Sequence, residues 1–275
     1  MALLVILLIV FGLVLIWLIY KHITTKHDIL RRFKNGNVIV SGRKGYGKDV
    51  LFNYVINKRN DDYFANLNYG GNYHNISIKD IELTPNDYNN FIKGNIEKIP
   101  KNDPLEGKDI YISDAGVYLP SQFDSVIQKT YPSLSIFFAL NRHLYNNGMH
   151  LNTQRLDRVF KSLREQADSY ILIRKRVIKL PFFLIIRTRV YEKYDSAIQE
   201  LEPLNSRFFN KYSKAEVDLY NAKHGYIKNG LLVIRKRSLH YDSRAFHEIL
   251  FGYKAPTKIK KDNNNDDVIE IIERG

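Results

Sequence analysis

Residues 38 to 51 read VIVSGRKGYGKDVL, in which the types and spacing of the glycines and the lysine suit phosphate binding. An apolar strand runs into a glycine-rich turn, and a lysine stands at the start of an apolar helix. In such a loop the backbone N–H groups and the helix N-terminus face the anion, and the lysine meets the outer phosphates. The expected nucleotide contacts are Gly42, Arg43, Lys44, Gly45, Tyr46, Gly47, Lys48, Asp49 and Val50.

Asp49 departs from the usual pattern G-x-x-x-x-G-K-[ST], in which a hydroxyl at this position binds Mg²⁺. A carboxylate about 4 Å from a phosphate charge costs on the order of 4 kcal/mol at an effective dielectric of 20, unless a cation lies between them. The loop therefore predicts that ATP binds together with Mg²⁺, and that Asp49 is a metal ligand.

The segment IYISDAGVYLPS is the candidate for the second metal-binding strand, which in such enzymes ends in a carboxylate. Two alignments are open. If Asp114 lies at the metal, Ala115 follows it and no acid is next in line to activate water. If SDAG matches a typical DEAG, Ser113 lies at the metal and Asp114 activates the water. We favour the second alignment because it keeps the Ala-Gly that follows.

The favoured alignment places a carboxylate, Asp49, where a hydroxyl is usual, and a hydroxyl, Ser113, where a carboxylate is usual. One hypothesis is that the two magnesium ligands have exchanged positions and the site still works. The alternative is that both positions changed after catalysis was lost. The sequence therefore favours ATP binding more strongly than ATP hydrolysis.

Strands and helices alternate through the chain from residue 36, which predicts an α/β domain with a mostly parallel sheet covered by helices on both faces. Residues 60 to 107 are expected to hold short strands, loops and one helix, and the segment SKAEVDLYNAKHG a short helix. Edge strands are expected in VIKLPFFLIIRTRVYEKY. The other expected strands are NVIVSG, DIYISDAG, MHLNTQ and SYILIRKR, and the other expected helices are DVLFNYVINK, LSIFFALNRHLYNNG and RLDRVFKSLREQAD.

Residues 2 to 20 carry no charged side chain and are long enough as a helix to cross the roughly 30 Å hydrocarbon core of a bilayer. Trp17 and Tyr20 stand where interfacial anchors are usual, and there is no basic start or small-residue cleavage site, so an uncleaved anchor is favoured over a signal peptide. The basic residues that follow place residues 21 to 275 in the cytoplasm by the positive-inside rule. They are Lys21, Lys26, Arg31, Arg32 and Lys34.

Forty-two Lys and Arg against 29 Asp and Glu give a net charge of +13, which suits anionic partners such as nucleic acid, nucleotides or acidic lipid. The chain has no cysteine, which excludes disulfides and cysteine-based zinc sites, and no structural metal is expected. The expected organisation is a transmembrane helix (1–21), a basic juxtamembrane segment (22–35), a P-loop ATPase domain (36–254, with edge strands and a helical part from 176) and a disordered tail (255–275).

Further motifs follow the loop in a fixed order: GRKGYGKD, ISDAG, an RH pair in a helix, TQ at the end of a strand, and LREQAD. Over residues 36 to 176 this order resembles the Zot family of filamentous-phage assembly ATPases, within the FtsK/HerA group of DNA-pumping motors. The resemblance implies that Thr153 and Gln154 form a polar sensor, with Gln154 near the γ-phosphate. It also implies that Arg164, or else Arg142, meets the nucleotide of a neighbouring subunit in a ring, so that the catalytic set is Asp114, Arg164, Arg142 and Gln154.

The membrane segment precedes the ATPase domain here, whereas the Zot pattern places it afterwards with a periplasmic portion, so no toxin activity carries over. The resemblance implies a single-pass protein of the host inner (cytoplasmic) membrane that powers DNA packaging or extrusion during virion assembly. DNA, further copies of the chain and other phage assembly or capsid proteins are the expected partners. The alternative is a catalytically inactive membrane scaffold that keeps the P-loop fold.

Overall fold

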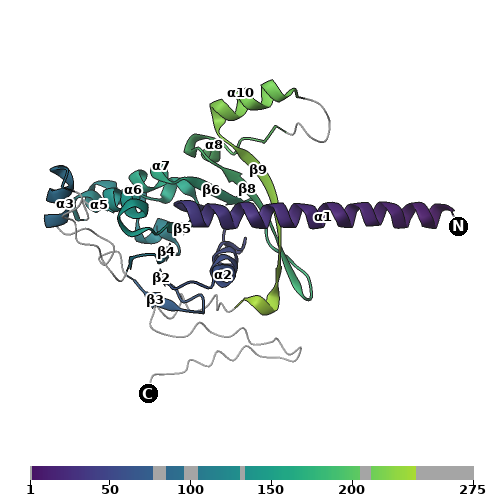
Figure 1. Cartoon of the computed structure of the whole chain (residues 1–275), viewed down its shortest axis with the longest axis horizontal. Helices are drawn as coiled ribbons and strands as arrows, with labels where there is room; N and C mark the ends of the chain where they lie inside the picture. The colour runs from purple at the N-terminus through teal and green to yellow at the C-terminus, as the bar shows by residue number, and fades with distance from the viewer. Residues whose placement is uncertain (1, 77–84, 96–104, 131–133, 205–211, 240–275) are drawn as a thin grey trace, which may run out of the picture. The chain divides into compact units, whose positions relative to one another are not determined.

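The fold is seen in a computed structural model (Figure 1), which describes residues 2–76, 85–95, 105–130, 134–204 and 212–239. All of these belong to one compact unit, Met1–Asp242. The predicted tail, 255–275, and the predicted end of the ATPase domain at residue 254 lie outside the described residues.

A nine-stranded sheet forms the centre of this unit, in the order β3-β2-β4-β5-β1-β6-β8-β7, with β9 paired to β8. The pairings from β3 to β6 are parallel and those of β7, β8 and β9 are antiparallel, so the prediction of a mostly parallel sheet is confirmed. The strands are β1 Val38–Ser41, β2 Tyr63–Ala65, β3 Tyr73–Asn75, β4 Asp109–Ile112, β5 Met149–Thr153, β6 Ser169–Ile173, β7 Ile178–Lys179, β8 Phe183–Tyr191 and β9 Ile227–Arg235.

Strand β5 lies between β1 and β4, since Leu151 pairs with Ile39 on one side and with Ile112 on the other. All three strands are parallel, so their carboxyl ends finish at the same edge of the sheet. In open α/β sheets this edge is where ligands bind. The sheet order therefore brings the glycine loop after β1 and the SDAG segment after β4 to one place, although the two strands are not neighbours.

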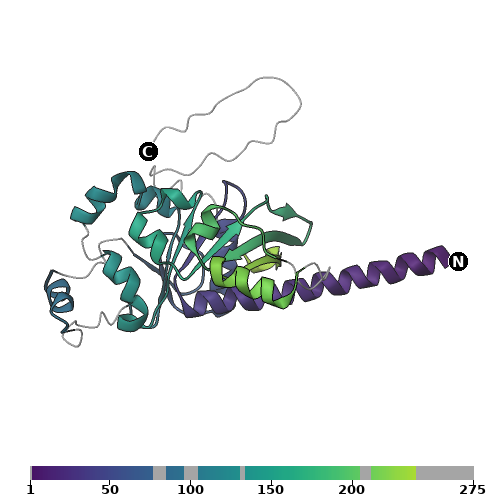
Figure 2. The same cartoon turned by 90° about the horizontal axis from the view of Figure 1, so that it is seen from above.

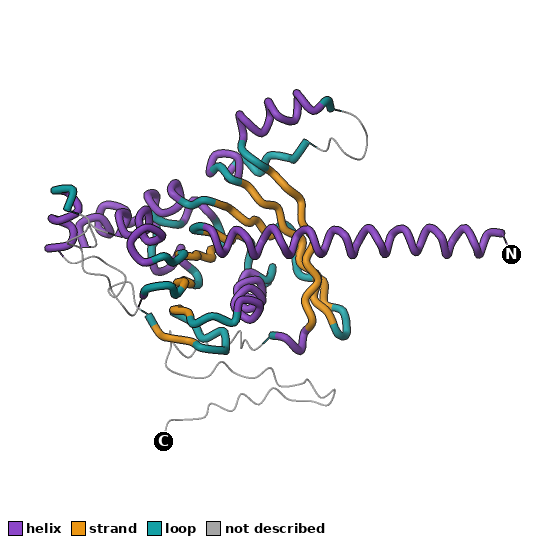
Figure 3. The backbone as a smooth tube through the Cα atoms, in the orientation of Figure 1, coloured by secondary structure: helices purple, strands orange, loops and turns teal. Residues whose placement is uncertain are grey.

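Helices cover both faces of the sheet, as the tube in Figure 3 shows. On one face Ile39, Ile110 and Leu151 belong to the same buried cluster as Phe137 of α6 and Leu163 of α7. The helices are α1 Ala2–Asn35, α2 Lys48–Arg59, α3 Pro85–Ile92, α4 Ala115–Tyr118, α5 Asp124–Thr130, α6 Leu134–Tyr145, α7 Lys161–Gln166, α8 Tyr194–Ile198 and α10 Lys214–His224, with 3-10 turns η4 Ser121–Phe123, η5 Leu156–Arg158 and η6 Lys236–Ser238.

On the opposite face, aromatic side chains join α1 and α2 to the centre of the sheet. The ring of Phe33 in α1 lies 4.7 Å from that of His150 in β5 and 6.0 Å from that of Phe52 in α2, measured between centroids. Phe52 in turn makes an edge contact with Tyr111 of β4 at 5.3 Å. The end of α1 is thus part of the core of the domain.

Helix α1 runs without a break through the predicted membrane segment and the predicted juxtamembrane segment. Its first part is exposed and apolar, and the helix is long and apolar enough to cross a membrane. Its second part is packed onto the domain, where Arg32 is buried, donates to Ser169 Oγ at 2.9 Å and pairs with Glu192 at 3.3 Å. The segment 22–35 therefore packs on the sheet and joins the exposed apolar part of the helix directly to the domain.

The segment RLDRVFKSLREQAD does not form the single helix that its pattern predicts. It forms the short turn η5 and then α7, because Val159 makes an isolated antiparallel bridge with Pro120 and Phe160 N donates to Leu119 O at 2.8 Å. The helix expected in SKAEVDLYNAKHG is confirmed as α10. Its Ser213 hydroxyl accepts from Glu216 N at 3.3 Å and the Glu216 carboxylate accepts from Ser213 N at 2.6 Å, which completes a capping box.

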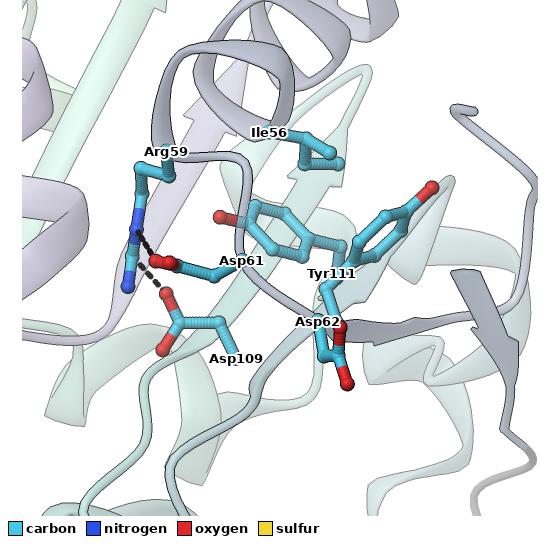
Figure 4. Close-up of a pocket in the computed structure, with 7 residues that line it drawn as sticks. Ile56, Arg59, Asp61, Asp62, Asp109 and Tyr111 are labelled. Atoms are coloured by element: carbon cyan, nitrogen blue, oxygen red, sulfur yellow. Dashed lines mark hydrogen bonds and ion pairs between the residues drawn. The ribbon is translucent and has the colours of Figure 1, made fainter. Parts of the chain in front are cut away.

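A buried polar cluster lies at the amino-terminal edge of the sheet, away from the glycine loop, beside the pocket drawn in Figure 4. The carboxylate of Asp109, the first residue of β4, contacts the guanidinium of Arg59 and His150 Nε2, the latter at 3.2 Å, and accepts from Gly148 N at 2.8 Å. Burial works to raise the pKa of Asp109, but the contacts with His150 and Arg59 outweigh burial and lower this pKa. Burial lowers the pKa of His150.

Replacing Asp109 with alanine is expected to lower the free energy of unfolding by about 3–5 kcal/mol, because Arg59 and His150 would lose their buried carboxylate. Asp61→Ala is the matched control, since Asp61 is an exposed partner of the same arginine at 3.3 Å and such pairs contribute about 0–1 kcal/mol. Urea denaturation of the full chain in detergent measures both, and equal small losses would contradict a stabilising role for the cluster.

Candidate nucleotide-binding site

The glycine loop between β1 and α2 has the backbone geometry that anion binding requires. Gly45 and Gly47 have φ values of 77° and 97°, a region that favours glycine, and α2 begins directly afterwards at Lys48. A side chain at Gly47 would also collide with Val177, next to β7. Tyr46 N donates to Arg43 O at 3.1 Å and closes the loop. The positive φ and the closeness of Val177 make the last turn depend on glycine at position 47.

Lys48 occupies the first position of α2 and is only 5% exposed. Its ammonium group makes no hydrogen bond or ion pair with any residue in the described part of the chain. The carboxylate of Asp114 is near enough for the charge of Lys48 to act on its pKa, but the buried ammonium group lacks a direct partner among the described residues, and a bound anion would supply one. Lys48, the helix N-terminus and the open loop therefore form a site for a phosphate group.

Asp49, the next residue of α2, is held by side chains from three other segments. Its Oδ1 accepts hydrogen bonds from Ser113 Oγ at 2.8 Å, Asn152 Nδ2 at 2.8 Å and Tyr69 OH at 3.1 Å. Ser113 Oγ lies 2.8 Å from Tyr69 OH and accepts from Asn152 Nδ2 at 3.0 Å. The residue after the lysine and the residue after β4 are thus in direct contact, as the favoured alignment requires.

Two asparagines fix the SDAG turn at the end of β4. Asn66 pairs with the backbone of Ser113, accepting from its N at 2.7 Å and donating to its O at 3.0 Å. Asn152 Oδ1 accepts from Asp114 N at 2.9 Å, and Asp114 has a φ of 49°. The position of Asp114 is therefore set by its neighbours rather than by a regular strand.

Asp114 is half-buried, and its pKa is raised, first by burial and then by the negative charge of Asp49, while Lys48 and Lys44 act in the opposite direction. A raised pKa brings a carboxylate closer to the range in which a general base works well. The environment of Asp114 suits proton transfer from a water molecule.

The oxygen atoms of this cluster fit a magnesium ion. Mg²⁺ prefers hard oxygen ligands, and Asp49 and Ser113 offer a carboxylate and a hydroxyl side by side. The three donors to Asp49 all bind Oδ1, which leaves its second oxygen to a cation. No group of three or more His, Asp or Glu that could hold a metal occurs among the described residues, so phosphate oxygens and water would complete the coordination.

The residues expected to form the sensor lie at the end of β5. Thr153 is buried, donates from Oγ1 to Arg155 O at 3.0 Å and faces Gly116, whereas Gln154 is exposed. The polar side chain that joins the loop to the SDAG turn is instead Asn152, one position earlier. The sensor role of Gln154 stays a prediction.

The two expected arginines make contacts within the domain. Arg164 Nη1 donates to Asp157 O at 2.6 Å and to Val159 O at 3.3 Å, and its guanidinium lies 5.5 Å from the centre of the Tyr194 ring. Arg142 of α6 pairs with Asp168 at 3.7 Å. Asp168 directly precedes the first residue of β6, so this pair lies at the opposite edge of the sheet from the glycine loop. To reach the nucleotide of another subunit, Arg164 would have to break its hydrogen bonds to both carbonyl oxygens.

The exchange hypothesis predicts that Asp49→Thr and Ser113→Asp each lower magnesium-dependent ATP hydrolysis and that the double variant recovers. The first change leaves two hydroxyls and no carboxylate, and the second places two carboxylates within hydrogen-bond distance, where both cannot ionise readily. Residues in direct contact show coupling of about 0.5–3 kcal/mol, so recovery of up to roughly 100-fold is expected. A double variant no faster than the slower single one would exclude exchange.

The parallel sheet, the glycine loop between β1 and α2 and the SDAG turn after the non-adjacent β4 define the fold as that of a P-loop NTPase. No protein-family model matches the sequence, and no curated protein matches it.

One of the solved structures with a similar fold comes from the family that the motifs resemble. The N-terminal domain of zonular occludens toxin from Neisseria meningitidis is 13% identical over 74% of this chain and 96% of that chain, with a TM-score of 0.42. The genome packaging NTPase B204 of Sulfolobus turreted icosahedral virus 2, in complex with AMP, is 21% identical over 54% of this chain and 78% of that chain, with a TM-score of 0.34. These likenesses are remote, and the fold class follows from the chain's own sheet order and loop.

Proposed function

We propose that this chain is a membrane-anchored ATPase that moves DNA during phage assembly. The observation that carries the proposal is the buried Lys48 at the end of the glycine loop, which makes no hydrogen bond or ion pair within the described residues and lies next to the cluster that Asp49 forms with Ser113. Together these groups supply a phosphate site, a pair of oxygen ligands and, in Asp114, a carboxylate that can take up a proton.

Each side chain has a part in ATP hydrolysis. The loop N–H groups and Lys48 bind and orient the triphosphate, and Asp49 and Ser113 would hold the metal ion. Bound Mg²⁺ neutralises phosphate charge and stabilises the charge that develops during transfer. Asp114 accepts a proton from the attacking water, and Asn152 keeps the Asp114 backbone in place through its 2.9 Å hydrogen bond.

The rest of the proposal concerns location and partners. The apolar part of α1 would cross the host inner membrane, with residues 21 to 275 in the cytoplasm. The net charge of +13 suits contact with DNA phosphates. Assembly into a ring, with other phage assembly or capsid proteins as partners, follows from the resemblance of the motifs to Zot-type motors.

ATP hydrolysis by the full chain in phospholipid nanodiscs, with and without DNA, tests the motor function. DNA should raise the rate of hydrolysis. Comparing single-stranded with double-stranded DNA shows which of the two is the substrate. Added salt should weaken the stimulation, because binding to DNA phosphates releases counterions. Hydrolysis that is the same with both kinds of DNA and without DNA would contradict a DNA motor.

An inactive scaffold is the second candidate, and one observation favours it: three protein donors already satisfy Asp49 Oδ1, so the cluster is stable without a metal. A scaffold predicts that Lys48→Ala leaves phage production unchanged. An ATPase predicts that the same change lowers phage production.

A further inference from the structure

The turn between β7 and β8 exposes a group of apolar side chains that the ATPase site does not use. Phe182 is 71% exposed, Leu180 41%, Ile178 39% and Phe183 38%. The turn is nevertheless ordered, because Leu180 N donates to Phe183 O at 2.9 Å and Lys236 N donates to Phe182 O at 3.0 Å. These residues, 178–183, are called the apolar turn below.

Positive charge surrounds the apolar turn. Residues 174–183 and 235–237 contain seven Lys or Arg and no Asp or Glu. Arg174 pairs with Glu202 at 3.1 Å, and the other six are exposed: Lys175, Arg176, Lys179, Arg235, Lys236 and Arg237. Exposed aromatic and aliphatic side chains ringed by cations are typical of protein segments that lie in the headgroup layer of an anionic membrane.

The contacts of α1 show on which side of the domain the apolar turn lies. Leu231 N of β9 donates to Thr25 Oγ1 at 3.0 Å, and Val233 N donates to His22 Nδ1 at 3.1 Å. Lys21 Nζ also donates to Asn229 O at 3.1 Å, so β9 crosses α1 at residues 21–25, directly after the apolar segment 2–20.

Strand β8 pairs with β9 in the antiparallel sense, Ile185 with Val233 and Phe183 with Arg235. The apolar turn therefore lies next to this crossing, two residues along β8 from the partner of Val233, and close to the end of the segment 2–20. In Figure 2 the turn between β7 and β8 points to the same side as the N-terminal end of α1, and in Figure 1 it lies below the middle of α1.

We propose that the apolar turn inserts into the headgroup region of an anionic bilayer, the same bilayer that α1 spans. The inference rests on the membrane-anchoring part of the proposed function and adds a second, peripheral contact. Phe182 and Leu180 would enter the interface at the level of Tyr20, while the surrounding cations bind anionic headgroups. The domain would then be held to the membrane at two points and not by a helix alone.

Site-specific fluorescence tests this proposal, because the chain has no cysteine and any introduced cysteine is unique. Full-length Phe182→Cys, labelled with an environment-sensitive dye, is reconstituted in vesicles of phosphatidylcholine and phosphatidylglycerol that carry a shallow spin-labelled lipid. The dye should be blue-shifted and quenched. Removing phosphatidylglycerol should reduce the quenching.

Two further variants complete the test. Phe123→Cys in η4 is the matched control, an aromatic residue that is 51% exposed, next to α5, which lies far from the N-terminal end of α1 in Figure 1; its dye should not be quenched. Trp17→Cys reports on α1 and should be quenched whatever the lipid charge.

Quenching at Trp17 with none at Phe182 would overturn the inference and leave the anchor intact. A blue-shifted but unquenched Phe182 dye would overturn it in favour of contact with a second copy of the chain. Absence of quenching at Trp17 would overturn the anchor, and the inference with it.

Discussion

Asp114→Asn is expected to lower the rate of ATP hydrolysis by about 10²–10⁴-fold, the range that general base catalysis contributes, while nucleotide binding remains. The amide has nearly the same shape and can keep the turn at the end of β4, but it cannot accept a proton from water. Two quantities test this prediction in Asp114→Asn and the wild type: the turnover rate and the affinity for a non-hydrolysable ATP analogue. An unchanged rate would contradict the role of Asp114 as the base.

The same variant separates the two alignments of the SDAG turn. If Ser113 lies at the metal, the magnesium concentration that gives half the maximal rate should stay the same in Asp114→Asn. If Asp114 is itself the metal ligand, that concentration should rise. The 2.8 Å contact of Ser113 with Asp49 leads us to expect no change.

Stability should change in the opposite direction to activity. The folded-state pKa of Asp114 is raised, by burial and by Asp49, above the unfolded value of about 3.9. The folded chain therefore binds the proton more tightly, and ionisation of Asp114 costs stability once the pH exceeds the folded pKa. Asp114→Asn removes this cost, so Tm at pH 7 should rise. In the wild type, hydrolysis should fall as the pH is lowered through the raised pKa.

The sequence predicted those parts of the site that have a short, local signature. An apolar run, three glycines and a lysine within fourteen residues determine β1, the loop and the start of α2. The favoured alignment of SDAG predicts that Asp49 and Ser113 share one metal site, and the structure places their side-chain oxygens 2.8 Å apart. Their roles at the metal stay predictions.

The residues that complete the cluster had no such signature. Asn66 and Tyr69 lie in a stretch rich in Asn, Asp, Gly and Tyr with weak periodicity, and only the folded chain brings them to the SDAG turn. Asn152 belongs to a strand that was predicted. Side chains alternate between the faces of a strand, so Asn152 and Thr153 point to opposite sides, whereas the resemblance implied Thr153 and Gln154 as the sensor and not Asn152.

Two larger features of the fold also depend on contacts distant in sequence. Strand β9 contains Asn229-Gly230, a pair that usually indicates a turn. In the structure Gly230 lies inside β9 where α1 crosses the strand closely. A Cβ at this position would lie 2.7 Å from Thr25 Cγ2, so the close crossing requires glycine. The charges of residues 22–35 likewise favour a solvent-exposed segment, whereas the partners of Arg32 lie on β6 and directly after β8.

Lys48→Ala tests whether the glycine loop binds and hydrolyses ATP. Lys48 is buried at the start of α2 and makes no hydrogen bond or ion pair in the part of the chain that the structure describes, so its loss should remove a preorganised charge from the reacting group. Loss of one such stabilising group typically costs about 10²–10³-fold in rate. Lys58→Ala, at the exposed far end of the same helix, is the control and should leave the rate unchanged.

The measurement is magnesium-dependent ATP hydrolysis by the full chain in nanodiscs, with wild type, Lys48→Ala and Lys58→Ala side by side. We expect hydrolysis by the wild type and by Lys58→Ala, and its near-complete loss in Lys48→Ala. No hydrolysis by the wild type, or equal rates in all three proteins, would contradict this expectation.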